Sequence, residues 1–489
     1  MPRQTASLPG LTLTPHSDRP LARQLASALR ESMLSGQLGP GARLPSTRLL
    51  AGELGVSRNT VLEAYAELLA EGYLEGQIGS GTFVSRLLPE EGRAVGHADT
   101  AEDLSTIALS ARGERIAGVR HWQSGVELRP FNPGLPALDP ALFDFWWRTA
   151  ARWRRRLGPA ELNYGDAAGY GPLREAIAAW VGPSRGVRCT ARQIIVTAGA
   201  QPALALAARL LLDVGDQAWM EDPGYEGAKG ALIAAGLTLV PVPVDDDGLD
   251  VDEGMARAPE ARMAYVSPSH QYPLGVVMAL TRRLRLLEWA ERAGAWIVED
   301  DYDTEFRYGG RPLPALQSLD RASRVLYVGT FSKVLFPSLR LGYIVVPDEL
   351  VGAFRRAQAT AGHRPSTLDQ AVLAEILASG QFMRHVRRMR RRYEQRRDLL
   401  DAEIRRQLAP SLMLTGAHTG LHGVGRLAPG FDDRDVSARA AAAGISVPPL
   451  SAYYTGPPRV SGLVLGYGHL DENAIRAGVR ALASLLRAG

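Results

Sequence analysis

The sequence predicts an α/β protein in which a small helical domain precedes a large domain built on a mainly parallel sheet. Three observations support this prediction. The chain has 489 residues, enough for about two to four domains. Residues 19–85 contain three helical segments and a glycine-tipped hairpin, whereas residues 128–489 alternate continuous apolar strands with helices. Residues 86–127 show little periodicity, so we expect a linker between the two domains.

The composition excludes several classes of protein. The hydrophobic fraction is 46% and the charged fraction 22%, which is typical of a globular protein rather than a disordered one. No apolar run approaches about 20 residues, and the start of the chain lacks the apolar core of a secretion signal. The single cysteine, Cys189, excludes an internal disulfide and a cysteine-based zinc cluster. We therefore expect a cytoplasmic protein with no membrane segment and no metal site.

The first domain is predicted to fold as three helices and a hairpin. A first helix over residues 19–35 has an apolar residue at every fourth position. A second, short helix covers residues 46–55, and a third begins at a serine cap and covers residues 57–72. Residues 76–84 form a short hairpin with glycines at its tip. A tight glycine turn between the second and third helices, followed by such a hairpin, predicts a winged helix-turn-helix.

The start of the third helix carries side chains that suit DNA. Ser57, Arg58, Asn59 and Thr60 can all form hydrogen bonds, and arginine and asparagine have the bidentate geometry for guanine and adenine edges. Arg48, in the preceding helix, is placed for a phosphate contact. Up to the end of this domain, seven arginines balance seven acidic residues. Charge alone therefore does not separate DNA binding from the alternative, a small helical module that binds protein.

The run LPSTRLLAGELGVSRNTVLEAYAELLAEGYLEGQIGSGTFV resembles the DNA-binding domain of the GntR regulator family, over about 65 residues. The resemblance implies that Arg48, Arg58, Asn59 and Thr60 contact a double-stranded DNA operator. It also implies that the wing lies near the minor groove. The wing runs from Gly79 through Ser80 and Gly81 to Thr82.

The second domain shows buried strands separated by helices, the pattern of a mainly parallel sheet covered on both faces. After Pro347 the pattern turns helical, with a long arginine-rich helix at about residues 379–408. That helix could add contacts to flanking DNA, although a solvated face is the simpler interpretation. The chain closes with a strand and a helix, which predicts a smaller C-terminal subdomain.

Several residues with reactive or phosphate-binding side chains lie close in sequence to one lysine, Lys333. Lysine and arginine together number 56, but only Lys229 and Lys333 are lysines, so Lys333 occupies a position where arginine has not replaced it. Lys333 follows a buried strand, close to Thr330, Ser332 and Arg340. A lysine at the carboxyl edge of a parallel sheet suits a Schiff base with an anionic aldehyde, whose phosphate the hydroxyls and the arginine would bind. Arginine cannot form this imine.

Other segments supply groups for the same cofactor. Asp300 ends a strand and can hold a pyridine nitrogen protonated, and Tyr302 can donate to a phenolic oxygen. Backbone N–H groups near Ala200 and Gln201, at a helix start, can bind phosphate, and Tyr225 can stack on a ring. Each alone has a simpler explanation as a cap, a common turn or plain packing. Together, in this order on one sheet, they predict a pyridoxal 5′-phosphate (PLP) site.

Residues 128–489 resemble a fold-type I, PLP-dependent aminotransferase. The runs EDDYDTEFRY, GTFSKVLFPSLRLGY, SPSHQYPLG and RHVRRMRRRYEQRRD together resemble the MocR family, whose members join a GntR-type head to an aminotransferase-like body. The resemblance implies that Lys333 carries PLP, that Asp300 contacts the pyridine nitrogen and that Tyr302 contacts the phenolic oxygen. It further implies a ring contact by Tyr225. The implied phosphate contacts are Thr330, Ser332, Arg340 and the Ala200–Gln201 turn, with Tyr164 reaching the partner subunit's phosphate in a homodimer.

The sequence departs from the aminotransferase pattern at one point. Where aminotransferases carry Asn-Pro-x-Gly, this chain has Tyr272-Pro273-Leu274-Gly275. The missing asparagine argues against efficient transamination. For the carboxylate of an effector, Arg459 is our candidate and Arg426 its competitor.

Two functional classes stay open. The first is a transcription regulator that senses PLP or a PLP–amine adduct and controls vitamin B6 or amine metabolism. The second is an aminotransferase with an accessory DNA-binding head. The head favours the first, since an enzyme gains nothing from operator recognition. The effector could be PLP itself or an amine such as GABA, taurine or D-alanine. A two-fold dimer would bring two heads to two half-sites.

Overall fold

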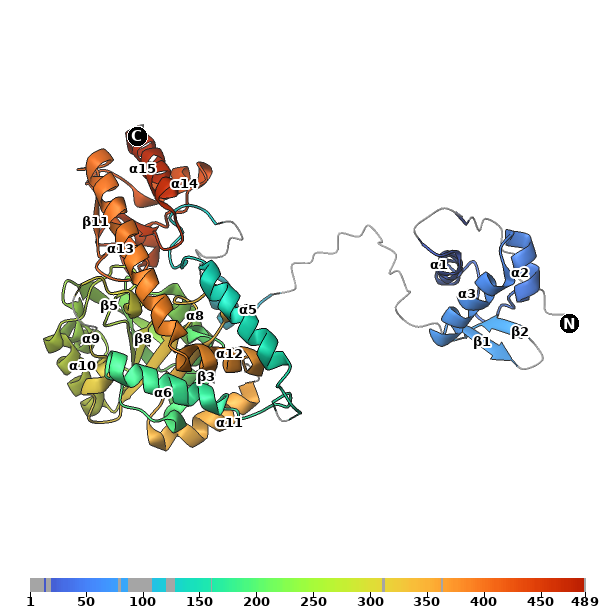
Figure 1. The fold of residues 1–489 in the computed structure, drawn as a ribbon, viewed down its shortest axis with the longest axis horizontal. Coiled ribbons are helices and arrows are strands. Elements are labelled where there is room, and N and C mark those ends of the chain that lie inside the picture. The colour runs from blue at the N-terminus through green and yellow to red at the C-terminus, as the bar shows by residue number, and fades with distance from the viewer. Residues whose placement is uncertain are drawn as a thin grey trace. The chain divides into compact units, whose positions relative to one another are not determined.

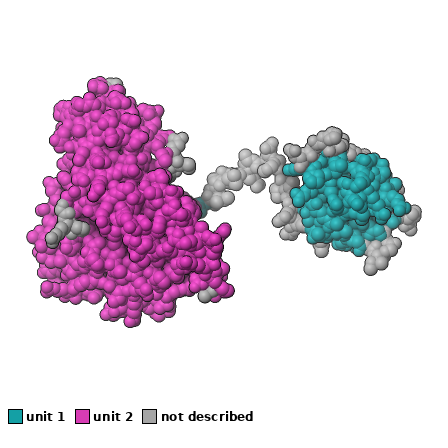
Figure 2. All heavy atoms as spheres, viewed as in Figure 1, with its two compact units in different colours: residues 1–108 teal, residues 109–489 magenta. Residues whose placement is uncertain are grey.

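The computed structural model describes residues 13–14, 19–77, 81–86, 108–119, 128–159, 161–309, 313–361 and 364–487. The chain divides into two compact units, residues 1–108 and residues 109–489, which we call unit 1 and unit 2. Figure 2 colours them teal and magenta.

Unit 1 is the expected helix-turn-helix. It contains α1 (Leu21–Leu34), α2 (Thr47–Leu54), α3 (Arg58–Ala70) and the hairpin strands β1 (Leu74–Gln77) and β2 (Gly81–Val84), which are antiparallel. Ser46 and Ser57 cap α2 and α3 by accepting bonds from backbone N–H groups. Gly55 ends α2 in the left-handed region, at φ +65, which a side chain would disfavour. Gly79 and Ser80 of the predicted wing lie outside the described residues.

A single apolar core holds unit 1 together. The core side chains come from all three helices and from the hairpin, and most of them are fully buried; they include Leu25, Leu29, Leu50, Val61 and Leu68. The spacing of the buried residues on α1 is the fourfold spacing that predicted this helix.

Unit 2 is built on an eight-stranded sheet with the strand order β3-β10-β9-β8-β7-β4-β5-β6. Strands β5, β4, β7, β8 and β9 are mutually parallel, whereas β10 is antiparallel to β3 and β9 and β6 is antiparallel to β5. The mainly parallel prediction is therefore confirmed. In chain order the strands are β3 (Ile194–Thr197), β4 (Gln217–Asp222), β5 (Thr238–Asp245), β6 (Gly248–Leu249), β7 (Met263–Val266), β8 (Trp296–Asp301), β9 (Val325–Thr330) and β10 (Gly342–Val345).

Helices cover both faces of this sheet (Figure 1). Alternate strand residues point to opposite faces, so Ile195 and Val298 pack against α7, α8 and α11, whereas Trp219 and Ile297 pack on the other face with α9 and α10. The helices of unit 2 are α4 (Ala111–Ala117), α5 (Pro140–Arg154), α6 (Gly171–Arg185), α7 (Ala200–Leu211), α8 (Glu226–Ala234), α9 (Val251–Arg257), α10 (Leu280–Ala293), α11 (Val351–Ala361), α12 (Thr367–Ala378), α13 (Gln381–Gln407), α14 (Asp433–Ala442) and α15 (Glu472–Arg487).

The smaller C-terminal subdomain is also confirmed. It contains an antiparallel sheet of β11 (Leu412–Thr415), β12 (His422–Leu427) and β13 (Gly462–Gly466). The arginine-rich α13 contacts α12 at one end and α15 and β11 further along, so it connects the large sheet to the small one (Figure 1).

The range in which we expected a linker, residues 86–127, is described only at residue 86 and at residues 108–119. In the second stretch α4 forms and packs on α8. The boundaries of the linker stay a prediction. Among the described residues, no helix combines the length and the apolar character needed to cross a bilayer.

Candidate functional site

One cavity of unit 2 lies where several strands of the large sheet reach their carboxyl ends. All the predicted cofactor residues except Tyr164 line it. They are Ala200, Gln201, Tyr225, Asp300, Tyr302, Thr330, Ser332, Lys333 and Arg340. Ligand sites of open α/β sheets form at this edge because the loops after parallel strands meet there.

Asp300 is the buried acid of the cavity. Its Oδ2 accepts a hydrogen bond from the Tyr265 hydroxyl at 2.7 Å, and its Oδ1 is buried with no partner among the described residues. Burial raises the pKa of Asp300 to about 7, while the bond from Tyr265 acts in the opposite direction. The neighbouring Asp301 faces elsewhere, since it pairs with the buried Arg185 at 2.6 Å.

Lys333 follows β9 and is the lysine of the cavity. Its ammonium donates to the carbonyl of Gly134 at 3.0 Å. Burial lowers the pKa of Lys333, and Asp303 and Asp300 partly oppose this effect. The other lysine, Lys229, is bonded to Glu226 and to the Tyr453 carbonyl outside the cavity lining.

Two groups that can bind an anion line the cavity, the start of α7 and Arg340. Helix α7 begins at Ala200, so its first N–H groups lack intrahelical partners. Arg340 lines the cavity, and its guanidinium makes no ion pair or hydrogen bond within the described residues. Its backbone is left-handed, at φ +50, a sparsely populated conformation for a side chain other than glycine. Such outliers are common where a functional side chain is held in position.

The residues of the cavity fit PLP. The unpartnered Oδ1 of Asp300 is an acceptor for a protonated pyridine nitrogen, and no other donor competes for it among the described residues. Lys333 offers a primary amine, and Arg340 offers a free guanidinium for phosphate.

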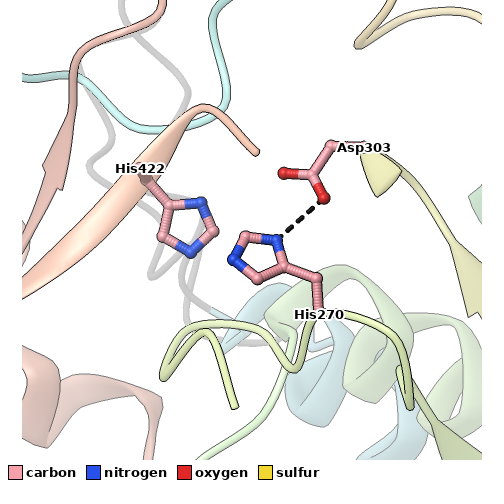
Figure 3. A group of neighbouring side chains, drawn as sticks. All are labelled: His270, Asp303 and His422. Atoms are coloured by element: carbon pink, nitrogen blue, oxygen red, sulfur yellow. Dashed lines mark hydrogen bonds and ion pairs between the residues drawn. The ribbon is translucent and has the colours of Figure 1, made fainter. Parts of the chain in front are cut away.

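Sequence reasoning missed several polar residues of the site. Tyr265 holds Asp300, and Asp303 and His422 line the cavity. His270 donates from Nδ1 to Asp303 Oδ1 at 2.8 Å (Figure 3), and the Tyr302 hydroxyl lies 3.1 Å from the same nitrogen. His270 and Asp303 stood in the motifs SPSHQYPLG and EDDYDTEFRY, but nothing in either motif indicated that the two segments meet.

Three predicted residues lie outside this cavity. Tyr164 is 85% exposed and lies in a separate pocket, where Arg364 donates to its carbonyl at 2.8 Å. Arg459 and Arg426 are exposed and do not line this cavity. Both act electrostatically on the half-buried Tyr454.

The predicted DNA-contacting residues of unit 1 lie close together. Arg58 and Asn59 are exposed in the first turn of α3, and Arg48 is exposed on α2. Ser57 is occupied as the cap, since its oxygen accepts from the Thr60 N–H at 3.1 Å.

Charge is segregated on α3. Glu67 and Glu71 lie towards the far end of this helix from Ser57, and both pair with Arg30 there. Sequence reasoning missed Arg43, whose guanidinium lies beside Gly81 at the start of β2.

Comparison with known proteins agrees with both units. The family model for bacterial regulatory proteins of the gntR family matches residues 21–84, and the model for aminotransferase class I and II matches residues 135–460. The chain is 43% identical to the probable rhizopine catabolism regulatory protein MocR of Rhizobium meliloti over 474 residues, covering 97% of this chain and 95% of that protein.

Two further similarities come from a regulator and from an enzyme. The pyridoxine biosynthesis transcriptional regulator PdxR of Corynebacterium glutamicum is 33% identical over 476 residues, covering 96% of this chain and 97% of PdxR. The structure of LysN, the α-aminoadipate aminotransferase of Thermus thermophilus in complex with N-(5′-phosphopyridoxyl)-L-leucine, has a TM-score of 0.67 and 29% identity, covering 78% of this chain and 95% of LysN. The chain therefore belongs to the MocR-type transcription regulators, which combine a gntR-family helix-turn-helix domain with a class I and II aminotransferase domain.

Proposed function

We propose that this regulator binds PLP covalently at Lys333 and that PLP, or an adduct of PLP with an amine, changes its affinity for DNA. One observation carries the proposal: Lys333 shares a cavity with a buried carboxylate oxygen, Asp300 Oδ1, that has no partner among the described residues. When bound, PLP supplies an aldehyde that links to a primary amine. In the described cavity lining, only Lys333 offers one.

The other cavity residues would orient the cofactor. Asp300 accepts from the pyridine nitrogen and keeps it protonated, Tyr302 donates to the phenolic oxygen, and Tyr225 packs on the ring. The phosphate partners in this proposal are Ala200, Gln201, Thr330, Ser332 and Arg340.

Unit 1 would place the start of α3 in the major groove. Arg58, Asn59 and Thr60 read base edges there, Ser57 caps the helix, and Arg48 binds a phosphate. The wing residues Gly79, Ser80 and Gly81 approach the minor groove. In this proposal residues 19–85 bind the operator, residues 86–127 link the two domains, and residues 128–489 bind the effector. The protein acts in the cytoplasm, because the operator DNA lies there.

We further propose a homodimer in which Tyr164 completes the partner subunit's phosphate site. The free, exposed hydroxyl of Tyr164 supports this role, since nothing in the described part of the chain bonds it. Two subunits present two heads to two half-sites. Cofactor binding then shifts DNA affinity only by its differential affinity for two arrangements of the heads, typically about 1–3 kcal/mol.

The controlled genes belong to vitamin B6 or amine metabolism in this proposal. The name of PdxR, a regulator of pyridoxine biosynthesis, supports the vitamin B6 part of this proposal. The second candidate function, an aminotransferase with a DNA-binding head, draws on the likeness to LysN. Tyr272 in place of the usual asparagine favours the regulator, with at most a residual half-reaction.

Covalent PLP binding is tested by trapping. The purified protein should show a visible absorption band with PLP, and borohydride should fix PLP on the peptide that contains Lys333. Lys333→Arg keeps the positive charge but cannot form an imine, so the band should disappear. A band that persists in Lys333→Arg, or PLP trapped on Lys229, would contradict the proposal.

Regulation is separated from catalysis by two measurements on the same preparation. DNA affinity for the region upstream of its own gene should differ between the cofactor-free and the PLP-loaded protein. Incubation with an amino acid and a keto acid should give one half-reaction or none. Many catalytic cycles, together with DNA affinity that ignores PLP, would favour the enzyme.

A further inference from the structure

One wall of the cavity carries polar groups that the proposed PLP site does not use. We call Asp303, His270 and His422 the polar wall; each is 1% exposed. Asp303 follows β8, His270 follows β7, and His422 is the first residue of β12, so the wall joins the large sheet to the C-terminal sheet (Figure 3). Asp303 and His422 line the cavity itself.

The hydrogen bonds of the wall leave acceptors free. His270 Nδ1 faces Asp303 Oδ1 at 2.8 Å, so we assign its proton to that bond. Asp303 Oδ2 is then buried without a partner among the described residues. His422 Nε2 lies 3.2 Å from the Pro273 carbonyl, which places the ring proton there and leaves the lone pair on Nδ1. Burial lowers the pKa of His422 well below its usual value, so the ring is neutral near pH 7.

A metal ion is a poor occupant of this wall. The three residues offer ligand atoms within 4.8 Å of one another. However, the two nitrogens of an imidazole point away from each other, and His270 Nδ1 already bonds the Asp303 carboxylate. An ion on His270 Nε2 is out of reach of that carboxylate, and an ion on Nδ1 would have to replace the bond. An organic donor meets the free Oδ2 without breaking any bond.

The charges of the cavity point to the same kind of ligand. Its described lining carries four charged side chains, namely Asp300, Asp303, Lys333 and Arg340. The proposed function assigns Asp300 to the pyridine nitrogen, Lys333 to the aldehyde and Arg340 to the phosphate. Asp303 remains, and no arginine of the lining is left for a carboxylate. An effector carboxylate at this wall would meet the carboxylate of Asp303 and the Nδ1 lone pair of His422, and both would repel it.

We propose that the polar wall selects an effector amine whose body carries hydrogen-bond donors, hydroxyl or ammonium groups, in place of a carboxylate. This inference rests on the proposed function, because the effector's amine reacts with PLP. Exchange at the cofactor needs no oxidant: the C=N bond to the Lys333 nitrogen breaks as one to the effector nitrogen forms, and both amine protons pass to the lysine. Asp303 Oδ2 and His422 Nδ1 accept from the effector's donors, and His270 positions Asp303.

The test uses three amines with the same three-carbon chain on the full PLP-loaded chain. These are 3-amino-1-propanol, β-alanine and propylamine, with half-saturation read from the change in the PLP absorption band. We expect 3-amino-1-propanol to bind at least about tenfold more tightly than β-alanine, since a site of unpaired acceptors rejects a ligand without donors. Asp303→Asn should reduce the preference for 3-amino-1-propanol over propylamine about tenfold, because any effect of Asp303 on the pKa of Lys333 acts on both amines alike. His422→Leu, which also deletes an acceptor, should reduce the same preference.

Controls separate the wall from folding and from the cofactor. Asp433→Asn alters another buried aspartate, which bonds Ser451 outside the cavity, and should keep the preference. Lack of a PLP band in the unmodified protein counts against the proposed function. In that case calorimetry with the same amines on the Lys333→Ala chain still tests the wall. Tighter binding of β-alanine that Arg459→Ala abolishes, or equal losses for all three amines in Asp303→Asn, overturns the inference.

Discussion

The hydroxyl of Tyr265 donates to Asp300 Oδ2 at 2.7 Å, deep in the cavity of unit 2. The bond occupies one carboxylate oxygen and leaves Oδ1 for a ligand. Because Tyr265 bonds the charged form, it lowers the pKa of Asp300 against the larger effect of burial. A residue on β7 therefore sets how much of Asp300 is ionised near neutral pH.

Tyr265→Phe should weaken PLP binding in a pH-dependent way. Without the donor, the pKa of Asp300 rises further above about 7, so less carboxylate is available to the pyridinium at pH 7. We expect PLP affinity to fall several-fold at pH 7 and to recover towards the unmodified value at about pH 9. Absorbance titrations at pH 6–9 measure this. Tyr65→Phe, which removes a buried bond to the Pro45 carbonyl in unit 1, is the matched control. A loss independent of pH would show that Tyr265 acts only through packing.

Asp300→Asn should change how the stability of the cofactor-free protein depends on pH. The pKa of Asp300 is about 7 in the fold and about 3.8 in the unfolded chain, so the folded state binds more protons between these values. The free energy of unfolding therefore falls as pH rises from about 4 to 7, by at most about 1.4 kcal/mol per pH unit from this group.

Urea unfolding at pH 5, 6, 7 and 8 measures this effect. Asn does not titrate, so the free energy of unfolding of the variant should fall less between pH 5 and pH 8. The stability of the variant relative to the unmodified protein should therefore increase as pH rises. Glu299, whose pKa burial also raises to about 7, contributes equally to both proteins. Burial likewise raises the pKa of Glu221 to about 7, but Asp300 adds to this shift, so Glu221 should contribute slightly less in the variant. Parallel pH profiles would mean that Asp300 is ionised in the fold.

Arg58→Ala and Arg48→Ala should differ in their effect on DNA. Arg58 lies in the first exposed turn of α3, and its loss should cost about 1–3 kcal/mol on the operator and little on random DNA. Arg48→Ala should weaken binding to the operator and to random DNA alike. It should also lower the slope of log affinity against log salt concentration by about one unit. Fluorescence anisotropy at 50–200 mM salt measures both. Equal losses on both DNAs for Arg58→Ala would assign that residue to phosphate, and no binding upstream of its own gene at any salt would refute regulation.

Tyr164 should act across a dimer. Tyr164→Phe removes only the exposed hydroxyl, and we expect about tenfold weaker PLP binding from the lost phosphate contact. Mixing Tyr164→Phe with Lys333→Ala chains should restore one tight site per mixed dimer, because the lysine of one chain then meets the tyrosine of the other. Sedimentation velocity establishes the dimer first. Mixtures that bind like the two separate variants would show that Tyr164 does not reach the partner's site.

Local patterns were sufficient to predict the architecture. Ser46, Gly55 and Ser57 mark helix ends through backbone chemistry that depends on the residue and its neighbours alone, and the helix-turn-helix follows from them. Continuous apolar runs predicted the mainly parallel sheet, because strands buried on both faces have no polar side to alternate. The antiparallel direction of β10 and of the hairpin strand β6 was not predicted. The direction of a strand depends on the connection that precedes it and not on the strand's own residues.

The sequence by itself also predicted many of the residues that share the cavity with Lys333, because the loops that carry them meet at one edge of the sheet. Only the tertiary structure decided the polar wall. His270 and Asp303 come from neighbouring strand ends, but His422 is brought to them by a separate, C-terminal sheet. Side-chain orientation after the two sheets pack decides which oxygen of Asp303 stays free. It also decides that Arg459 and Arg426 lie outside the cavity. The periodicity of a segment shows which of its own faces is buried. It carries no information about which distant segment packs against that face.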